Sequence, residues 1–186
     1  MNKFILFISF FFIFFPPPEI PIPPNESIIA EALSITAPKP TATPMPTPTS
    51  VPTLYSTFTE EELNLLFKVV EAEATEGGLE EKTNVASVIF NRVRTGWSDG
   101  DLISILLSPR QFEVITNGRY KRVKVTETTI LACEFAFEND TVDGAIYFDC
   151  TNGESWAAQE CKKGNLIWVM KDGIGHDFYR KKRKGE

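Results

Sequence analysis

The region that begins at Thr59 carries apolar residues at helical spacing. Thr59 and Glu62 form a capping box, in which each side chain can accept a hydrogen bond from the other residue's free backbone amide. Apolar residues then recur three or four positions apart: Leu63, Leu66, Phe67, Val70 and Ala74. Residues with this spacing share one helix face, so the pattern predicts an amphipathic helix that ends before Gly77 and Gly78.

Three further helices are expected downstream. Helical spacing of apolar residues continues over 80–93, and a short helix over 101–108 is stopped by Pro109. Thr126 or Thr128 can cap a fourth helix, because a threonine hydroxyl accepts a hydrogen bond from a free amide of the first turn.

After the fourth helix the pattern becomes extended. Short apolar and aromatic runs cover residues 145–150, 165–172 and 176–180. Gly173 and Gly175 separate the last two runs, which suits a hairpin. We therefore predict an α+β fold, dominated by helices, with a small C-terminal antiparallel sheet.

The N-terminus has the pattern of an export signal. Lys3 precedes the nearly continuous apolar run 4–15, which is shorter than the ~20 residues that span a bilayer. Three prolines follow at 16–18 and argue against a buried helix. Residues 1–15 are interpreted as a signal peptide or, if they are not cleaved, as a membrane anchor. The protein is thus expected to be exported to the cell envelope or the extracellular space.

Composition divides the rest of the chain. Twelve of the 13 prolines lie between 16 and 52, mixed with threonine and serine, so we interpret residues 16–53 as an extended linker without a core. The folded domain is expected over 54–180, as a monomer, followed by a basic tail at 181–186. The net charge of −6 argues against binding to nucleic acid.

Cysteine and histidine are too few for a metal site. The three cysteines include Cys133, which lies within a helical run and is expected to be buried, whereas Cys150 and Cys161 could form a disulfide. The only histidine is His176 and no C-x-x-C motif occurs, so neither a zinc site nor a cofactor is expected.

Two carboxylates near the end of the first helix are candidates for catalysis. Glu73 lies beside the apolar positions of that helix, where burial would raise the pKa of its carboxyl group. Glu71 follows Lys68 by three residues and is expected to pair with it near solvent. An acid at the border of an apolar face is most often structural, so periodicity alone does not make Glu73 a catalyst.

Motifs in order along the chain make the region 62–180 resemble the spore-cortex-lytic, SleB/CwlJ-type cell wall hydrolases. The resemblance rests on E-A-T-E-G at 73–77, T-N-V-A-S-V-I-F-N-R-V at 83–93, S-P-R-Q-F at 108–112, G-A-I-Y-F at 144–148 and G-H-D-F-Y-R at 175–180. It implies a lysozyme-like or lytic-transglycosylase-like fold that cleaves the glycan strands of peptidoglycan. The essential acid of the family falls on Glu73.

The sequence departs from the family pattern beside that acid. Thr75 stands where the family has arginine, and Gly77 stands where it has a second acid, with Glu76 one position early. No repeated wall-binding module is present. Most glycosidases use two carboxylates, but a lytic transglycosylase needs one, because the C6 hydroxyl of N-acetylmuramic acid attacks within the same sugar. The resemblance therefore implies a transglycosylase with Glu73 alone.

The remaining site residues are expected to bind substrate. Gln111 and Phe112 would line the glycan cleft, and His176 would orient a sugar or Glu73. Tyr147 and Phe148 alternate on a strand, so one should be in the core and the other should face the cleft.

Two alternative functions remain open at the level of sequence. The first is an endopeptidase that cleaves wall peptides with Cys133, Cys150 or Cys161 as nucleophile and His176 as base. The second is a membrane-tethered module that binds the wall without cleaving it, held by residues 4–15.

Overall fold

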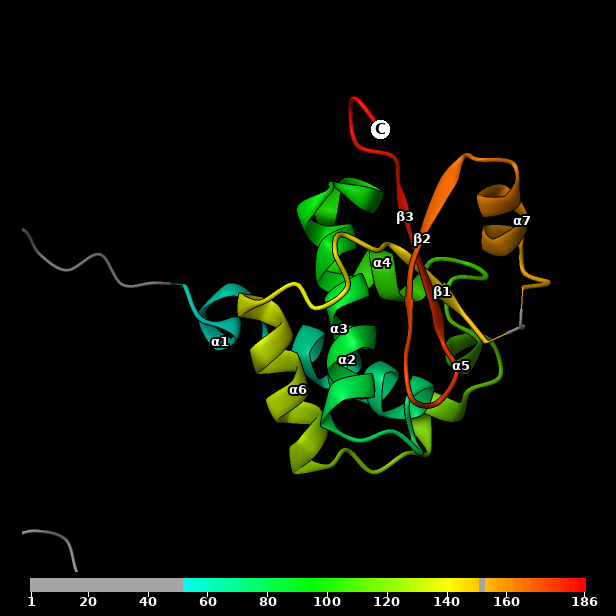
Figure 1. The fold of residues 1–186 in the computed structure, drawn as a ribbon. Helices are drawn as coiled ribbons and strands as arrows, with labels where there is room; N and C mark the ends of the chain where they lie inside the picture. Colours follow the sequence, from blue (N-terminus) through cyan, green and yellow to red (C-terminus); the bar gives the residue numbers. More distant parts are fainter. Residues whose placement is uncertain (1–51, 151–152) are drawn as a thin grey trace, which may run out of the picture. The chain divides into compact units, whose positions relative to one another are not determined.

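A computed structural model describes residues 52–150 and 153–186 of the chain (Figure 1). The expected signal segment and nearly all of the expected linker lie outside these residues. Among the described residues, no helix is both long enough and apolar enough to cross a membrane.

Helices dominate the structure, and short ones connect the longer ones (Figure 1). The α-helices of the described residues are α1 Leu54–Thr57, α2 Glu60–Glu73, α3 Leu79–Arg94, α4 Leu102–Leu107, α5 Glu113–Thr116, α6 Glu127–Glu138 and α7 Trp156–Lys162. Two 3₁₀ turns, η1 Trp97–Gly100 and η2 Arg119–Lys121, complete the set.

Helix α2 begins and ends as the sequence predicts. The backbone amide of Thr59 donates to the Glu62 carboxylate at 2.7 Å, and the Glu62 amide donates to the Thr59 hydroxyl at 3.3 Å. This reciprocal pair satisfies two amides that the first turn leaves free. The apolar face of the helix is fully buried, with Leu66, Val69 and Val70 at 0% exposure.

Helix α3 lies between the other helices and the sheet (Figure 1). Val85 and Ile89 pack in the larger core with residues of α2, α4 and α6. Val88 points the other way and packs with Phe178 of the sheet. A helix that is buried on opposite faces must be apolar on both, which is why the apolar residues of 80–93 are so closely spaced.

The sheet has three antiparallel strands in the order β1-β3-β2. They are β1 Tyr147–Asp149, β2 Leu166–Lys171 and β3 Asp177–Lys181. A register shift between Trp168 and Met170 marks a bulge in β2. The β2–β3 turn includes Gly175 with φ of +96°, a conformation that favours glycine. The predicted hairpin and the predicted α+β class are therefore confirmed.

The structure settles two details that the sequence left open. Thr126 alone caps α6, since its hydroxyl accepts from the amide of Thr129. The basic C-terminal segment is partly paired, because Arg180 bonds to Asp143 and to Glu186 and is buried.

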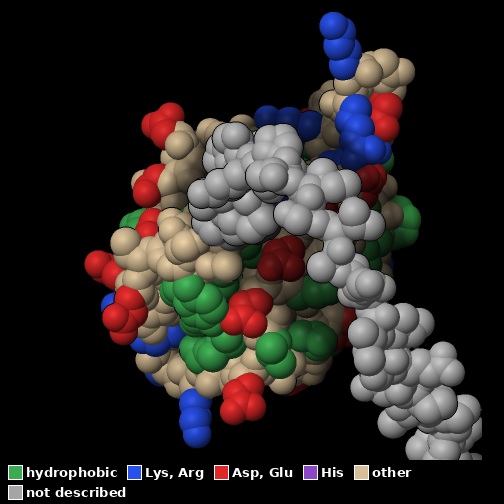
Figure 2. All heavy atoms as spheres, turned by 90° about the vertical axis from the view of Figure 1, so that its left-hand side faces the viewer, with side chains coloured by type: hydrophobic (Ala, Val, Ile, Leu, Met, Phe, Trp, Pro, Cys, Tyr) green, Lys and Arg blue, Asp and Glu red, His purple; other side chains and the backbone are tan. Residues whose placement is uncertain are grey.

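The face that carries α1 and α6 exposes hydrophobic side chains among acidic ones (Figure 2). Leu131 and Phe135 of α6 are each more than half exposed, as is Leu79 at the start of α3. Leu131 and Phe135 lie on the solvent side of α6, whose inner side chains Ala132 and Cys133 are fully buried.

Candidate active site

Glu73 is the last residue of α2 and its carboxyl group is poorly solvated. The side chain is partly buried, and its Oε1 is inaccessible to solvent and makes no hydrogen bond to any described residue. Burial raises the pKa of Glu73 to about 7, against the opposing effects of the Val114 backbone amide and the charges of Arg119 and Arg92. A carboxyl group with this pKa holds a proton near neutral pH and can donate it.

Charged residues from three other elements surround Glu73. Arg92 of α3 and Arg119 of η2 favour its ionised form, whereas the negative charge of Glu113 on α5 opposes ionisation. Arg119 is held in place by its Nη2, which donates to the carbonyl of Ala72 at 2.5 Å.

Glu71 has a different role from the one expected. It is 4% exposed, and its Oε1 lies 2.9 Å from Nζ of Lys82 on α3 rather than pairing with Lys68 near solvent. Its Oε2 accepts hydrogen bonds from Thr126 and Thr129 of the α6 N-terminus. Burial alone would raise the pKa of Glu71, but hydrogen bonds from Thr129, Lys82 and Thr126 hold it below the usual value.

The turn after α2 explains one departure from the family pattern. A Cβ atom at Gly77 would lie 2.7 Å from Cβ of Glu81 in the first turn of α3. That distance is far below van der Waals contact, so the close approach of α3 requires glycine here. The second acid of the family has no room at position 77, and Glu76 is exposed on the same turn as Glu73.

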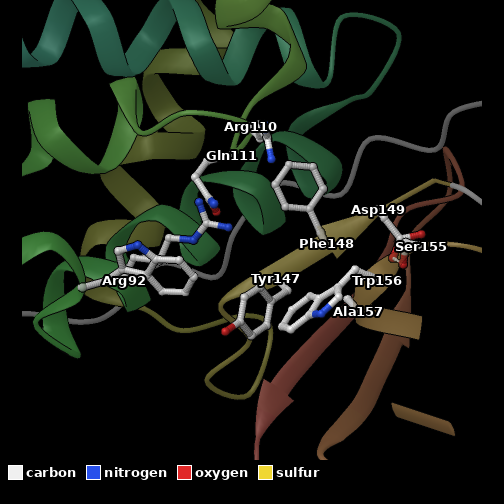
Figure 3. A pocket seen from close by; sticks show the side chains of 10 residues that line it. Arg92, Arg110, Gln111, Tyr147, Phe148, Asp149, Ser155, Trp156 and Ala157 are labelled. Atoms are coloured by element: carbon white, nitrogen blue, oxygen red, sulfur yellow. Dashed lines mark hydrogen bonds between the residues drawn. The ribbon is translucent and has the colours of Figure 1, made fainter. Parts of the chain in front are cut away.

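A cavity of about 500 Å³ lies between the helices and the sheet. Its lining residues come from five segments: Arg92, Trp97, Arg110, Gln111, Tyr147, Phe148, Asp149, Ser155, Trp156 and Ala157. Figure 3 shows Arg110 and Gln111 on one side of the cavity and the aromatic rings of Tyr147 and Trp156 on the other. Aromatic rings beside polar groups are the usual lining of a sugar-binding site. Glu73 does not line the cavity, but Arg92, whose charge acts on Glu73, does.

The predicted substrate residues divide into two groups. Gln111, Tyr147 and Phe148 line the cavity, so the expectation that only one of the two strand residues faces it is wrong. Both can do so because β1 is short and both its faces are only half covered. Phe112 is 2% exposed and lies behind the cavity wall.

His176 is also buried behind the wall. Its Nδ1 lies 2.9 Å from the Asp172 carboxylate, and its ring meets Phe148 edge to face at 5.1 Å. His176 is 4% exposed. It therefore supports Phe148 from behind, and contact between its ring and a sugar would require the wall to open.

The cysteines are not activated. Cys133, Cys150 and Cys161 are all free, and Cys133 is fully buried as expected. Burial raises the pKa of Cys150, and the charges of Glu73 and Asp149 raise it further. A nucleophilic thiol needs the opposite shift. Within 52–150 and 153–186, no group of histidine, cysteine and acidic residues could hold a metal ion.

The sequence profile of the Cell Wall Hydrolase family matches residues 76–169, just over half of the 186-residue chain. The chain belongs to the cell wall hydrolase family. The matched region begins at Glu76, three residues after Glu73, and it includes α3 and every residue that lines the cavity.

Two solved structures with a similar fold are catalytic domains of SleB proteins. This cell wall hydrolase resembles the catalytic domain of the germination-specific lytic transglycosylase SleB from Bacillus anthracis, with 20% identity and a TM-score of 0.57 over 68% of this chain and 100% of that one. The catalytic domain of the Bacillus cereus SleB protein gives 22% identity and a TM-score of 0.55 over 66% and 92%. No curated protein sequence matches significantly.

Sequence reasoning did not select three residues of this candidate site. Arg92 lies within the predicted second helix and lines the cavity. Glu113 lies on a four-residue helix, and Trp156 begins a seven-residue one. Elements this short contain too few turns to produce a periodic signal, so nothing in the pattern indicated which side chains they direct toward the site.

Proposed function

We propose that this cell wall hydrolase cleaves the glycan backbone of peptidoglycan between N-acetylmuramic acid and N-acetylglucosamine, with Glu73 as the catalytic acid. The observation that carries the proposal is the carboxyl group of Glu73, whose Oε1 is buried without a partner and whose pKa is raised to about 7. Membership of the cell wall hydrolase family supports the substrate class.

The proposed reaction uses the carboxyl group of Glu73 twice, first as an acid and then as a base. Protonated Glu73 donates to the glycosidic oxygen, and the bond from that oxygen to C1 of N-acetylmuramic acid breaks. The positive charges of Arg119 and Arg92 stabilise the carboxylate that is left. The C6 hydroxyl of the same sugar then attacks C1 and gives its proton to Glu73, which forms a 1,6-anhydro product and restores the acid.

Two observations support a transglycosylase over a two-carboxylate hydrolase. Position 77 has no room for a second acid, and Glu76 lies on the same turn as Glu73 rather than across a cleft. One solved structure of similar fold is described as a lytic transglycosylase. Glu113 is the one acid from another element whose charge acts on Glu73, and it is the candidate base of a hydrolytic alternative.

The test is a digest of purified cell walls by the full chain, with products separated by mass. Glu73→Gln keeps the side-chain shape and removes the proton, so the rate should fall by about 10²–10⁴-fold. Glu76→Gln is the matched control, because Glu76 is exposed and three residues away, and it should retain most of the activity. Near-normal activity in Glu73→Gln would contradict the assignment.

The products decide the reaction type. A transglycosylase releases anhydro-muropeptides, and Glu113→Gln should leave them the main product. Reducing muramic-acid ends that disappear in Glu113→Gln would instead indicate a hydrolase with two carboxylates.

Two other functions predict different results in the same assay. A cysteine endopeptidase would release cut peptides and be inactivated by alkylation of its thiols, and the raised pKa of Cys150 argues against it. A module that only binds would leave wall turbidity unchanged. Export, monomeric state and tethering through residues 4–15 belong to the proposal and rest on the sequence alone.

A further inference from the structure

Arg92 is a buried cation with an unused donor at the edge of the cavity. It is 3% exposed, and its Nε donates to the carbonyl of Ile146 at 2.8 Å. Its Cζ lies 4.8 Å from the ring centre of Trp97 and 5.0 Å from that of Phe112, so two aromatic rings hold the guanidinium group. Its Nη1 is inaccessible to solvent and makes no hydrogen bond to a described residue.

The charge of Arg92 also lacks a counter-ion. Burial lowers the pKa of Arg92 to about 10, which still leaves it positive at neutral pH. Among the described residues, the charges of Tyr147 and Glu73 raise the pKa of Arg92, but neither residue forms an ion pair with it. When Glu73 carries the proton that it is to donate, that partial compensation is lost. A buried charge in this state favours binding of an anion.

A second guanidinium group lines the same cavity. Arg110 is exposed and makes no ion pair with a described residue, and Figure 3 shows its side chain at the cavity on the side of Gln111. Its backbone has φ of +63°, a left-handed conformation that is costly for a residue with a side chain. The acid that lines the cavity, Asp149, accepts a hydrogen bond from Ser155.

We propose that Arg92 and Arg110 form a subsite for a carboxylate of the wall polymer, so that the enzyme selects strands that carry this charge. The inference rests on the proposed function, since it places a glycan in this cavity. It goes further by naming the chemical group that these two residues recognise.

A carboxylate fits the two arginines better than a neutral carbonyl oxygen does. A guanidinium group offers two parallel donors that match the two oxygens of a carboxylate, and a charged acceptor makes the stronger bond. The polymer offers carboxylates from two sources: the lactyl group of muramic acid without its peptide, and the acidic groups of a stem peptide. The rings of Tyr147 and Trp156 line the cavity beside this subsite and would stack on the sugar itself.

Binding measurements with the full chain carrying Glu73→Gln test the proposal without turnover. Four soluble glycans serve as probes: chitotetraose, the peptide-free tetrasaccharide of alternating N-acetylglucosamine and N-acetylmuramic acid, the same tetrasaccharide with its lactyl groups amidated, and the tetrasaccharide carrying stem peptides. Fluorescence of Trp97 and Trp156, which line the cavity, reports the dissociation constant.

A charged glycan should bind about tenfold more tightly than the amidated one, because a hydrogen bond to a charged group contributes more than one to a neutral group. The peptide-free and peptide-bearing probes tell which carboxylate is recognised. Arg110→Ala should abolish the preference while affinity for chitotetraose stays within about twofold, and Arg92→Lys, which keeps the charge but loses the paired donors, should weaken the preference. Arg122→Ala removes an exposed arginine that does not line the cavity. It is the matched control and should keep the preference for the charged glycan.

Equal affinity for charged and amidated glycans would overturn the inference and leave the proposed function standing. Survival of the preference in Arg110→Ala would also overturn the inference and leave the proposed function standing. Arg110 is exposed, so this substitution should not prevent folding. Failure to bind any of the four glycans, chitotetraose included, would instead overturn the proposed glycan site, and the subsite with it.

Discussion

Glu71 and Glu73 lie two residues apart on the same helix, yet their surroundings shift their pKa values in opposite directions. Hydrogen bonds from Thr129, Lys82 and Thr126 keep Glu71 ionised inside the protein. Glu73 is desolvated with Oε1 unpaired, and its carboxyl group stays protonated up to a pH of about 7. One acid is stabilised as a charge and the other as a proton donor, a division that depends on partners from distant segments.

The free energy of unfolding should depend on whether Glu73 carries its proton. The folded protein keeps this proton up to pH about 7, whereas the unfolded chain releases it near 4.5. The folded state therefore binds more protons between these values, and the contribution of Glu73 to stability falls as pH rises through them. Relative to wild type, Glu73→Gln should gain on the order of 2 kcal/mol in free energy of unfolding at pH 8 compared with pH 4. Urea denaturation at both pH values measures this difference, and Glu76→Gln should show none.

Glu71→Gln should destabilise the protein strongly. The substitution leaves the ammonium group of Lys82, which is 3% exposed, without its counter-ion. Breaking a buried ion pair in this way costs about 3–5 kcal/mol. The double variant Glu71→Gln/Lys82→Met should recover part of the loss, because it removes the unpaired charge. A thermal midpoint in Glu71→Gln equal to that of wild type would show that the pair contributes nothing.

At the scale of elements, the long helices and the short helix α4, which Pro109 stops, were predictable from the sequence, and the other short helices were not. Helices α2, α3 and α6 have 14, 16 and 12 residues, enough for the apolar positions to show a period. Helix α5 has four residues and carries Glu113. The resemblance to the family singled out Glu73, but Glu113 and Arg119 come from short elements that leave no periodic pattern in the sequence.

The β2–β3 hairpin depends on Asp172. Its carboxylate accepts hydrogen bonds from the backbone amides of Ile174 and His176 and lies 2.9 Å from Nδ1 of His176. Asp172→Ala should lower the free energy of unfolding by about 3 kcal/mol, since the amide of His176 and its ring nitrogen would be buried without a partner. Chemical denaturation checks this, with the exposed Glu80→Ala as control. A loss below about 0.5 kcal/mol, typical of a surface substitution, would show that the turn holds without the carboxylate.

At the scale of the whole molecule, amino-acid composition separates the proline-rich N-terminal segment from the folded domain. Twelve of the 13 prolines lie before residue 53, and the apolar core of the described residues begins at Leu54. A chain that lacks residues 1–52 should therefore unfold cooperatively at the same thermal midpoint as the full chain, within about 2 °C. Calorimetry measures the thermal midpoints of the two proteins. Aggregation of the shorter chain, cured by restoring residues 16–52, would show that the segment contributes to the core.

The family and the fold class could be predicted because motifs keep their order over two thirds of the chain. The site could be predicted only in part. Gln111, Tyr147 and Phe148 line the cavity, whereas Phe112 and His176 are buried behind its wall. Whether an aromatic residue faces a cavity or supports its wall is decided by the packing of helices against the sheet, which no local pattern records.

Gly77 limits the changes that evolution can make beside Glu73. Two of the four glycine codons become a glutamate codon by a single base change, so glutamate is within reach of mutation at such a position. The side chain would nevertheless meet the Cβ of Glu81 at 2.7 Å, on the helix that forms the centre of the fold. Selection would discard the change before any benefit of a second acid was felt. A lineage that had lost that acid could regain it here only after α3 had shifted, so the loss is effectively irreversible in single steps.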